Sequence, residues 1–243
     1  MRQQYFAITV FLYSMLVVCF HEVTLAASYE MADTQMHVMQ TSDTRNQDYM
    51  LYVQLPTGYE DSGNRHKHYP VIYLLDPYWD FPVVAGARSG LVFDGIVPEY
   101  IVVGIGYSTQ GQVEEGDVVN ILRKIDYTPV RDASEPNTGD AAAFMSFIKS
   151  SVIPFVEDSY RIADYRVFAG TSSGGLFSLY LMFENPGLFQ GHIAIAPAVG
   201  YFHRWAFVKE SLFYSADPVN GIDPSGRTLP TRLYMSVGSN DQL

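Results

Sequence analysis

Short apolar runs separated by longer polar stretches are the main pattern of this chain. The continuous runs occupy residues 71–75, 101–105, 167–169, 193–196 and 233–237. Runs of this length, with candidate helices between several of them, are typical of parallel strands that are buried on both faces of a sheet. Upstream, residues 49–55 alternate between apolar and polar side chains, which predicts a half-exposed strand in an initial antiparallel pair. The pattern therefore predicts an α/β fold of three layers around a mostly parallel sheet.

Between these apolar runs, the sequence predicts one helix, one long loop and one aromatic segment with two possible structures. The clearest helix spans residues 140–159, where Pro154 should introduce a kink. Its expected buried side carries Phe144, Phe147, Ile148, Val152 and Phe155. Residues 106–139 are mostly polar and predict a long loop, which in a compact domain is often functional. Residues 197–226 are dense in aromatic side chains, including Tyr201 and Trp205, and predict either a cap over a binding site or a helix packed on the core.

The most informative stretch is residues 165–183, where the run at 167–169 ends in Gly-Thr-Ser-Ser-Gly-Gly and a helix-periodic segment follows. A Gly-x-Ser-x-Gly pattern between a strand and a helix is the signature of a nucleophile elbow, with Ser172 at its apex. The glycines are needed because the strand and the helix pass close together beside a strained serine. The Ser173 amide and the helix dipole would then face the oxyanion that forms when Ser172 attacks an acyl group. The alternative is an ordinary Gly/Ser-rich turn.

Other candidate site residues follow the ends of other predicted strands, where sites form in sheets of this kind. After Leu75, the Tyr78 amide is the expected second oxyanion donor, because Pro77 has no N–H. Tyr78 and Trp79 could instead wall a substrate pocket or belong to an aromatic turn, and we expect Trp79, Tyr201 and Trp205 to contact substrate. After residues 233–237, Asp241 lies where a serine hydrolase carries the acid that orients its histidine. A turn-forming aspartate is the alternative.

Composition and the N-terminus narrow the possible partners and location. Residues 1–26 have a positive start, an apolar run and small residues near Ala26, which predicts a secretory signal peptide and leaves residues 27–243 as one domain. An uncleaved membrane anchor is the alternative. Cys19 is the only cysteine and lies in this segment, so a thiol nucleophile is not expected. The net charge of −11 argues against nucleic acid and anionic membranes as partners. A periplasmic or secreted protein without stable membrane association is predicted, and its oligomeric state stays open.

Several motifs, taken together, resemble the putative esterases of the α/β-hydrolase superfamily, which include ferric enterochelin esterases and S-formylglutathione hydrolase-like enzymes. The matching segments, in family order, are residues 73–76, 102–107, 126–129, 170–177 and 186–189. The resemblance implies a three-layer α/β-hydrolase fold and hydrolysis of a small-molecule carboxylic ester without a cofactor or metal. It implies Ser172 as nucleophile, Asp241 as acid, and the amides of Ser173 and Tyr78 as oxyanion donors. Thr171, Pro77 and the Ala-Pro-Ala at 196–198 depart from the family's common residues without removing a catalytic group.

The catalytic histidine is the serious departure from the family pattern. It should follow the acid on a later loop, yet all six histidines of the chain precede Asp241. His203 is the one upstream candidate, because it follows a strand end close to the elbow. We expect instead that the chain is a fragment of a longer esterase, in which the last strand and the histidine loop follow Leu243. Two other functions stay open, namely a non-catalytic ligand-binding protein on the same fold and an acyltransferase, since an alcohol can replace water as the acyl acceptor.

Overall fold

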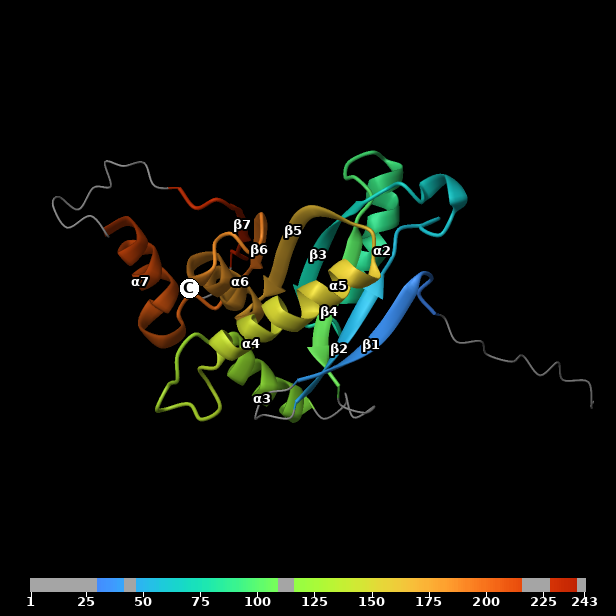
Figure 1. The fold of residues 1–243 in the computed structure, drawn as a ribbon. Helices are drawn as coiled ribbons and strands as arrows, with labels where there is room; N and C mark the ends of the chain where they lie inside the picture. Colours follow the sequence, from blue (N-terminus) through green and yellow to red (C-terminus); the bar gives the residue numbers. More distant parts are fainter. Residues whose placement is uncertain (1–29, 42–46, 109–115, 216–227, 240–243) are drawn as a thin grey trace, which may run out of the picture. The chain divides into compact units, whose positions relative to one another are not determined.

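One sheet organises the part of the chain that the structure describes (Figure 1). The computed structural model describes residues 30–41, 47–108, 116–215 and 228–239. Within these residues, the strands are β1 (Thr34–Gln40), β2 (Asp48–Gln54), β3 (Tyr69–Leu75), β4 (Ile101–Tyr107), β5 (Ile162–Thr171), β6 (Gly191–Ile195) and β7 (Arg232–Ser236). They lie in the order β1-β2-β4-β3-β5-β6-β7. The pairs β1–β2 and β2–β4 are antiparallel and all the others are parallel, so the predicted mostly parallel sheet is confirmed.

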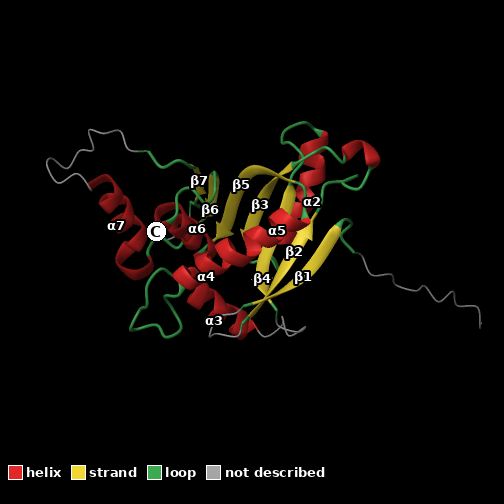
Figure 2. Cartoon of the chain, viewed as in Figure 1, coloured by secondary structure: helices red, strands yellow, loops and turns green. Residues whose placement is uncertain are grey.

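Helices cover both faces of this sheet. They are α2 (Asp80–Phe93), α3 (Gly116–Tyr127), α4 (Ala141–Phe147), α5 (Ile153–Ser159), α6 (Ser173–Glu184) and α7 (Tyr201–Ser215), with a short 3₁₀ turn at Ser62–Asn64. On one face, Tyr52 of β2 packs against Phe81 of α2, with ring centroids 5.8 Å apart. On the other face, Tyr49 of the same strand stacks on Phe147 of α4 at 4.4 Å. Figure 2 shows α4 and α5 lying across the front of the strands. The three-layer prediction is therefore confirmed.

The segment predicted as one kinked helix over residues 140–159 is helical throughout but changes its hydrogen-bond pattern. A π-helical turn at Ile148–Val152 separates α4 from α5. The turn ends just before Pro154, which lacks the N–H that a regular α-helix would use there. The predicted buried side is confirmed at Phe144, Phe147, Ile148 and Val152, whereas Phe155 is half-buried.

The structure corrects two expectations, one about residues 106–139 and one about the strand β7. Residues 106–139 are not one long loop, because they contain α3. This helix packs through Val119, Leu122 and Tyr127 and also buries the polar Asp126, while Val118 and Ile121 are exposed, so it shows no continuous apolar run. The β7 strand is not buried on both faces, because it pairs only with β6 and no described helix covers its outer residues. Leu233, Tyr234 and Met235 are 44–63% exposed.

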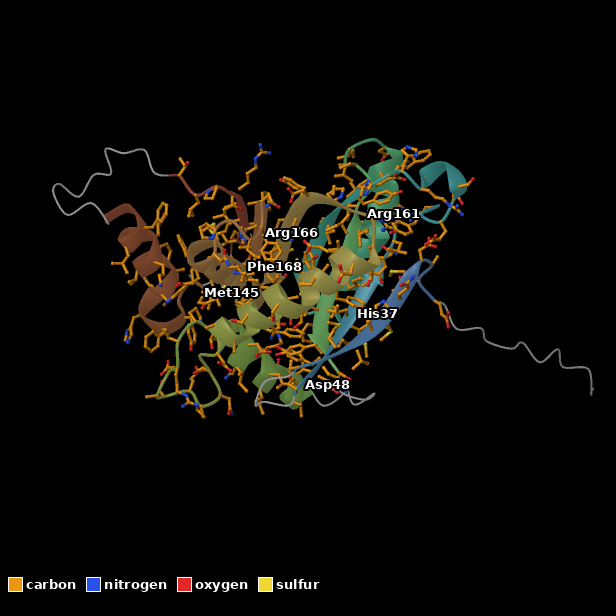
Figure 3. All side chains as sticks on the ribbon, in the orientation of Figure 1. His37, Asp48, Met145, Arg161, Arg166 and Phe168 are labelled. Carbon is orange, nitrogen blue, oxygen red and sulfur yellow. The ribbon has the colours of Figure 1, made fainter. Side chains whose placement is uncertain are left out.

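The core between the sheet and α6 is built mainly from aromatic rings. Phe168 of β5, labelled in Figure 3, is fully buried and contacts Phe177 of α6 at 5.7 Å and Phe189 at 5.0 Å. Because the last residues of β5 are held by this packing, the turn that follows β5 has a rigid base.

The chain separates into two units, Met1–Ala32 and Asp33–Leu243, and all elements named here belong to the second unit. The predicted signal peptide at residues 1–26 lies outside the described residues. Among the described residues, no helix is both long enough and apolar enough to cross a membrane.

Candidate active site

Ser172 occupies a strained turn between β5 and α6. Its φ of 57° and ψ of −117° lie in a region that L-residues rarely adopt and that is found at functional sites. The neighbouring glycines explain how this turn fits. A Cβ on Gly170 would lie 2.3 Å from the carbonyl oxygen of Gly174, and a Cβ on Gly175 would lie 3.0 Å from Pro197 Cα. The close approach predicted from the Gly-x-Ser-x-Gly pattern is therefore confirmed at Gly170. A collision was also expected at Gly174, but a Cβ there would make only ordinary contacts of 3.5 Å with Leu75 and Asp76.

The backbone of Ser172 is held on both sides, while its side chain points to solvent. The Ser172 amide donates to Ile195 O at 2.9 Å, and the Ser172 carbonyl accepts from Ala198 N and Leu176 N at 3.0 Å. These bonds tie the elbow to the end of β6, to the turn after it and to the first turn of α6. Ser172 is exposed, and its Oγ makes no hydrogen bond to any residue that the structure describes. The geometry is that of a rigidly held and accessible hydroxyl.

The turn after β3 lies directly beside this elbow, because β3 and β5 are parallel neighbours in the sheet. Asp76 begins the turn with a φ of 53°, and its carbonyl accepts from Trp79 N at 3.0 Å and from Asp80 N at 3.1 Å. Asp80 in turn accepts a hydrogen bond of 2.9 Å from the hydroxyl of Thr171, the last residue of β5. Residues 76–80, which we call the β3 turn, are therefore joined to the elbow by a direct contact.

The two amides predicted as oxyanion donors share one property. Neither the Tyr78 N–H nor the Ser173 N–H donates to a backbone carbonyl within the described part of the chain. Ser173 is the first residue of α6, where helix N–H groups have no intrahelical acceptor and the helix dipole is positive. Both amides are thus available to an acceptor that approaches Ser172.

The Tyr78 side chain anchors the β3 turn to β4. Its hydroxyl donates to Tyr107 O at 2.7 Å and accepts from Tyr107 N at 2.5 Å, so it continues the hydrogen bonding of the strand. Burial raises the pKa of this hydroxyl to about 12. Gly106 makes room for the turn, because a Cβ there would lie 2.7 Å from Pro77 Cγ and 2.9 Å from the Tyr78 hydroxyl. The Tyr78 side chain is therefore a structural anchor rather than a pocket wall.

A buried ion pair lies under the β3 turn, and the sequence analysis did not anticipate it. Arg123 of α3 contacts the Asp76 carboxylate with two hydrogen bonds, Nε to Oδ1 at 2.7 Å and Nη2 to Oδ2 at 2.9 Å. Tyr127 donates to the same Oδ1 at 3.2 Å. Burial raises the pKa of Asp76, and the hydrogen bonds and charge of Arg123 act against that rise. The only sequence signal was the place of Arg123, three residues before the Asp-Tyr-Thr-Pro segment.

The predicted substrate-contacting aromatics lie in different environments. Trp79 is 56% exposed on the β3 turn, with the Arg123 guanidinium 5.4 Å from its ring centroid. Tyr201 is half-buried and donates to Val130 O at 2.8 Å, which joins the start of α7 to the segment after α3. Trp205 is only 7% exposed and packs against Tyr180 of α6 with ring centroids 5.5 Å apart. Trp205 therefore belongs to a helix–helix contact, which agrees with the expectation that residues 197–226 include a helix packed on the core.

The acid and the base of a triad are not brought to Ser172 by the described residues. Asp241 lies outside them. His203 is exposed in the first turn of α7, where it and its neighbours have positive φ. His192 is buried in β6, and a hydrogen bond of 3.2 Å joins its Nδ1 to Ser178 Oγ rather than to Ser172. In the part of the chain described, no three His, Cys, Asp or Glu side chains gather as a metal site requires.

Comparisons with known proteins agree with this geometry. A family model described as "Putative esterase" matches residues 42–243. The ferri-bacillibactin esterase BesA of Bacillus subtilis is 30% identical over 221 residues, which cover 84% of this chain and 70% of that protein. Two solved structures share the fold with a TM-score of 0.72. They are the siderophore hydrolase EstB from Aspergillus nidulans (25% identity, 89% of this chain and 72% of that one) and the BES protein from Bacillus cereus (24%, 90% and 79%).

Proposed function

Because the chain belongs to the putative esterase family, with an α/β-hydrolase fold, we propose that it cleaves carboxylic esters through an acyl-enzyme formed on Ser172. The observation that carries this proposal is the strained elbow at Ser172, with an exposed hydroxyl and two unpaired amides, those of Ser173 and Tyr78, on either side. Preorganised backbone N–H groups at such a position stabilise an oxyanion without having to reorganise during the reaction.

The mechanism assigns each group one role. Ser172 Oγ attacks the ester carbonyl carbon and loses its proton to a histidine base, and the tetrahedral oxyanion accepts hydrogen bonds from the Ser173 and Tyr78 amides. The alcohol leaves with a proton from the same histidine, and water then releases the acid from Ser172. Asp241 is the acid that would orient this histidine. In this fold the base follows the acid along the chain, and His203 is the alternative among the histidines of the chain.

The substrate class follows from the relatives and from the exposed surface beside the elbow. BesA is named as an esterase of ferri-bacillibactin and EstB as a siderophore hydrolase. We extend this substrate class, an ester within a siderophore, to this chain. The exposed Trp79 ring lies on the β3 turn, which is bonded to the elbow through Asp80, and with Tyr201 it is the aromatic candidate for substrate contact. The proposed location is the periplasm or the outside of the cell, and the signal peptide predicted for residues 1–26 is its support.

Covalent labelling tests the nucleophile directly. The protein produced from its complete gene is incubated with a fluorophosphonate probe, and the labelled peptide is identified by mass spectrometry. We expect one label per chain on Ser172, lost in Ser172→Ala and retained in Ser146→Ala, which changes an exposed serine on α4. Labelling of another residue, or no labelling while a siderophore still binds, would favour the non-catalytic binding protein instead. A product in which the acyl group is carried by an added alcohol rather than released as acid would identify an acyltransferase.

A further inference from the structure

The Asp76–Arg123 pair is buried close to the elbow. The Asp76 side chain is 3% exposed and that of Arg123 18%. A Cβ placed on Gly174, the second residue of α6, would lie 3.5 Å from Asp76 Oδ2. The carboxylate therefore lies against the first turn of α6, on the side of the sheet from which Arg123 and Tyr127 approach. Both Asp76 oxygens are used by the guanidinium, which is the bidentate geometry that only arginine supplies.

The backbone of Asp76 carries the β3 turn and hence the Tyr78 amide. The Asp76 carbonyl accepts from both Trp79 N and Asp80 N, so the turn closes on this residue. The far end of the turn is tied to the elbow by Thr171, and the Tyr78 hydroxyl is tied to Tyr107. Ser172 itself is held by different bonds, to Ile195 and Ala198. A change at Asp76 would therefore move the Tyr78 amide relative to Ser172 while the nucleophile keeps its place.

The charge of the pair matters as much as its geometry. A tetrahedral oxyanion formed at Ser172 would place a new negative charge near the first turn of α6, where the Asp76 carboxylate already lies. Because the Asp76 carboxylate is buried, water screens its charge weakly, and it would repel this oxyanion. Paired with Arg123, the carboxylate adds no net charge to this region. Without the guanidinium, the carboxylate would oppose the charge that the two amides are there to stabilise.

We propose that Arg123 is a positioning residue of the esterase site, which holds Asp76 so that the Tyr78 amide is aimed at the oxyanion and which cancels the charge of that carboxylate. The inference rests on the proposed function of Ser172. It assigns Arg123 an effect on the rate of the chemical step and none on contact with the substrate.

The test combines three variants with active-site titration, so that only correctly folded sites are counted. Rates with a p-nitrophenyl ester are measured for Arg123→Met, for Arg123→Lys and for the double variant Arg123→Met/Asp76→Asn. Loss of one oxyanion donor lowers kcat by about 10²–10³, so we expect a fall of roughly 100-fold in Arg123→Met with little change in KM. Asp76→Asn removes the uncompensated charge, and the double variant should recover about 10-fold. Arg123→Lys restores the charge without the second hydrogen bond, and its kcat should lie between those of the parent and Arg123→Met.

The matched control is Lys124→Met. Lys124 is the next residue on α3 and pairs with Glu135 at the surface, where its side chain is 55% exposed. This variant should keep the parent kcat and KM. If Arg123→Met does not fold, the Arg123→Lys result decides, and a parent-like kcat there overturns the inference.

Other outcomes separate the two proposals. If the parent protein neither turns over the ester nor is labelled on Ser172, the proposed function itself is wrong. If the parent is active and Arg123→Met keeps its kcat within about twofold, the positioning role is wrong. An increase in KM at unchanged kcat would show that Arg123 contacts the substrate instead. An Arg123→Met/Asp76→Asn variant as slow as Arg123→Met would show that charge cancellation does not contribute.

Discussion

Acidification should destabilise this fold through one buried histidine. His192 is 1% exposed in β6, and burial lowers the pKa of its imidazole from 6.5 to about 4, although the hydrogen bond with Ser178 acts in the opposite direction. Its Nε2 has no hydrogen-bond partner among the described residues. The folded protein therefore keeps this imidazole neutral at pH values where the unfolded chain binds a proton.

The sign and size of the effect follow from proton linkage. Between pH 6.5 and 4 the unfolded state binds more protons than the folded state, so stability falls as the pH falls through this window and is unaffected by His192 above it. For a pKa of about 4 against 6.5, His192 alone should lower the free energy of unfolding by about 2 kcal/mol at pH 5 and about 3 kcal/mol at pH 4, relative to pH 7.5.

Urea unfolding at pH 7.5 and at pH 5 measures this effect, provided that the parent is compared with His192→Asn. Asparagine places an amide where Nδ1 lies and so can keep the contact with Ser178, but it does not titrate. The loss of stability between the two pH values should be about 2 kcal/mol smaller in His192→Asn than in the parent. His66→Asn, which replaces an exposed histidine, is the matched control and should lose as much as the parent. Equal losses in His192→Asn and the parent would refute the reasoning.

Three further substitutions have expected outcomes. Gly170→Ala puts a Cβ 2.3 Å from Gly174 O, so the elbow must move. The kcat/KM of this variant should fall by about 100-fold. The control is Gly187→Ala, whose Cβ meets no atom within 4 Å and which should keep the parent kcat/KM. Gly106→Ala crowds Pro77 and Tyr78 and should lower the free energy of unfolding by about 1–3 kcal/mol, whereas Gly86→Ala, in open space on α2, should not lower it. Arg88→Met removes a buried guanidinium that donates to the carbonyls of Gln54, Leu55 and Tyr100. This variant should lower the free energy of unfolding, measured with urea, by about 2 kcal/mol. A decrease below about 0.5 kcal/mol, which is the size expected of a surface substitution, would contradict this prediction.

Features of this fold that depend on a few neighbouring residues were predictable from the sequence. All five apolar runs lie in strands, because short continuous apolar runs separated by turn-forming residues favour the strands of a parallel sheet. The elbow at Ser172 was also recognised locally, since its two glycines and its serine lie within the five residues 170–174. Helix α3 was missed because its buried side includes the polar Asp126 and because it lies within the mostly polar residues 106–139. The exposure of β7 agrees with its place at the edge of the described sheet, where it pairs with β6.

Local residue patterns thus predicted the strands at the apolar runs and the glycine-flanked serine, and the esterase family was inferred from the resemblance of several motifs along the chain. The neighbours of that serine were decided only by the tertiary structure. Thr171 bonds to Asp80 from 91 residues away, and Arg123 reaches Asp76 from 47 residues away. The Thr171–Asp80 contact exists because β3 and β5 are adjacent in the sheet although β4 lies between them in the chain, and the Arg123–Asp76 contact exists because α3 brings Arg123 to the end of β3. The entropy of closing a loop changes only slowly with its length, so sequence separation carries little information about which strand ends meet.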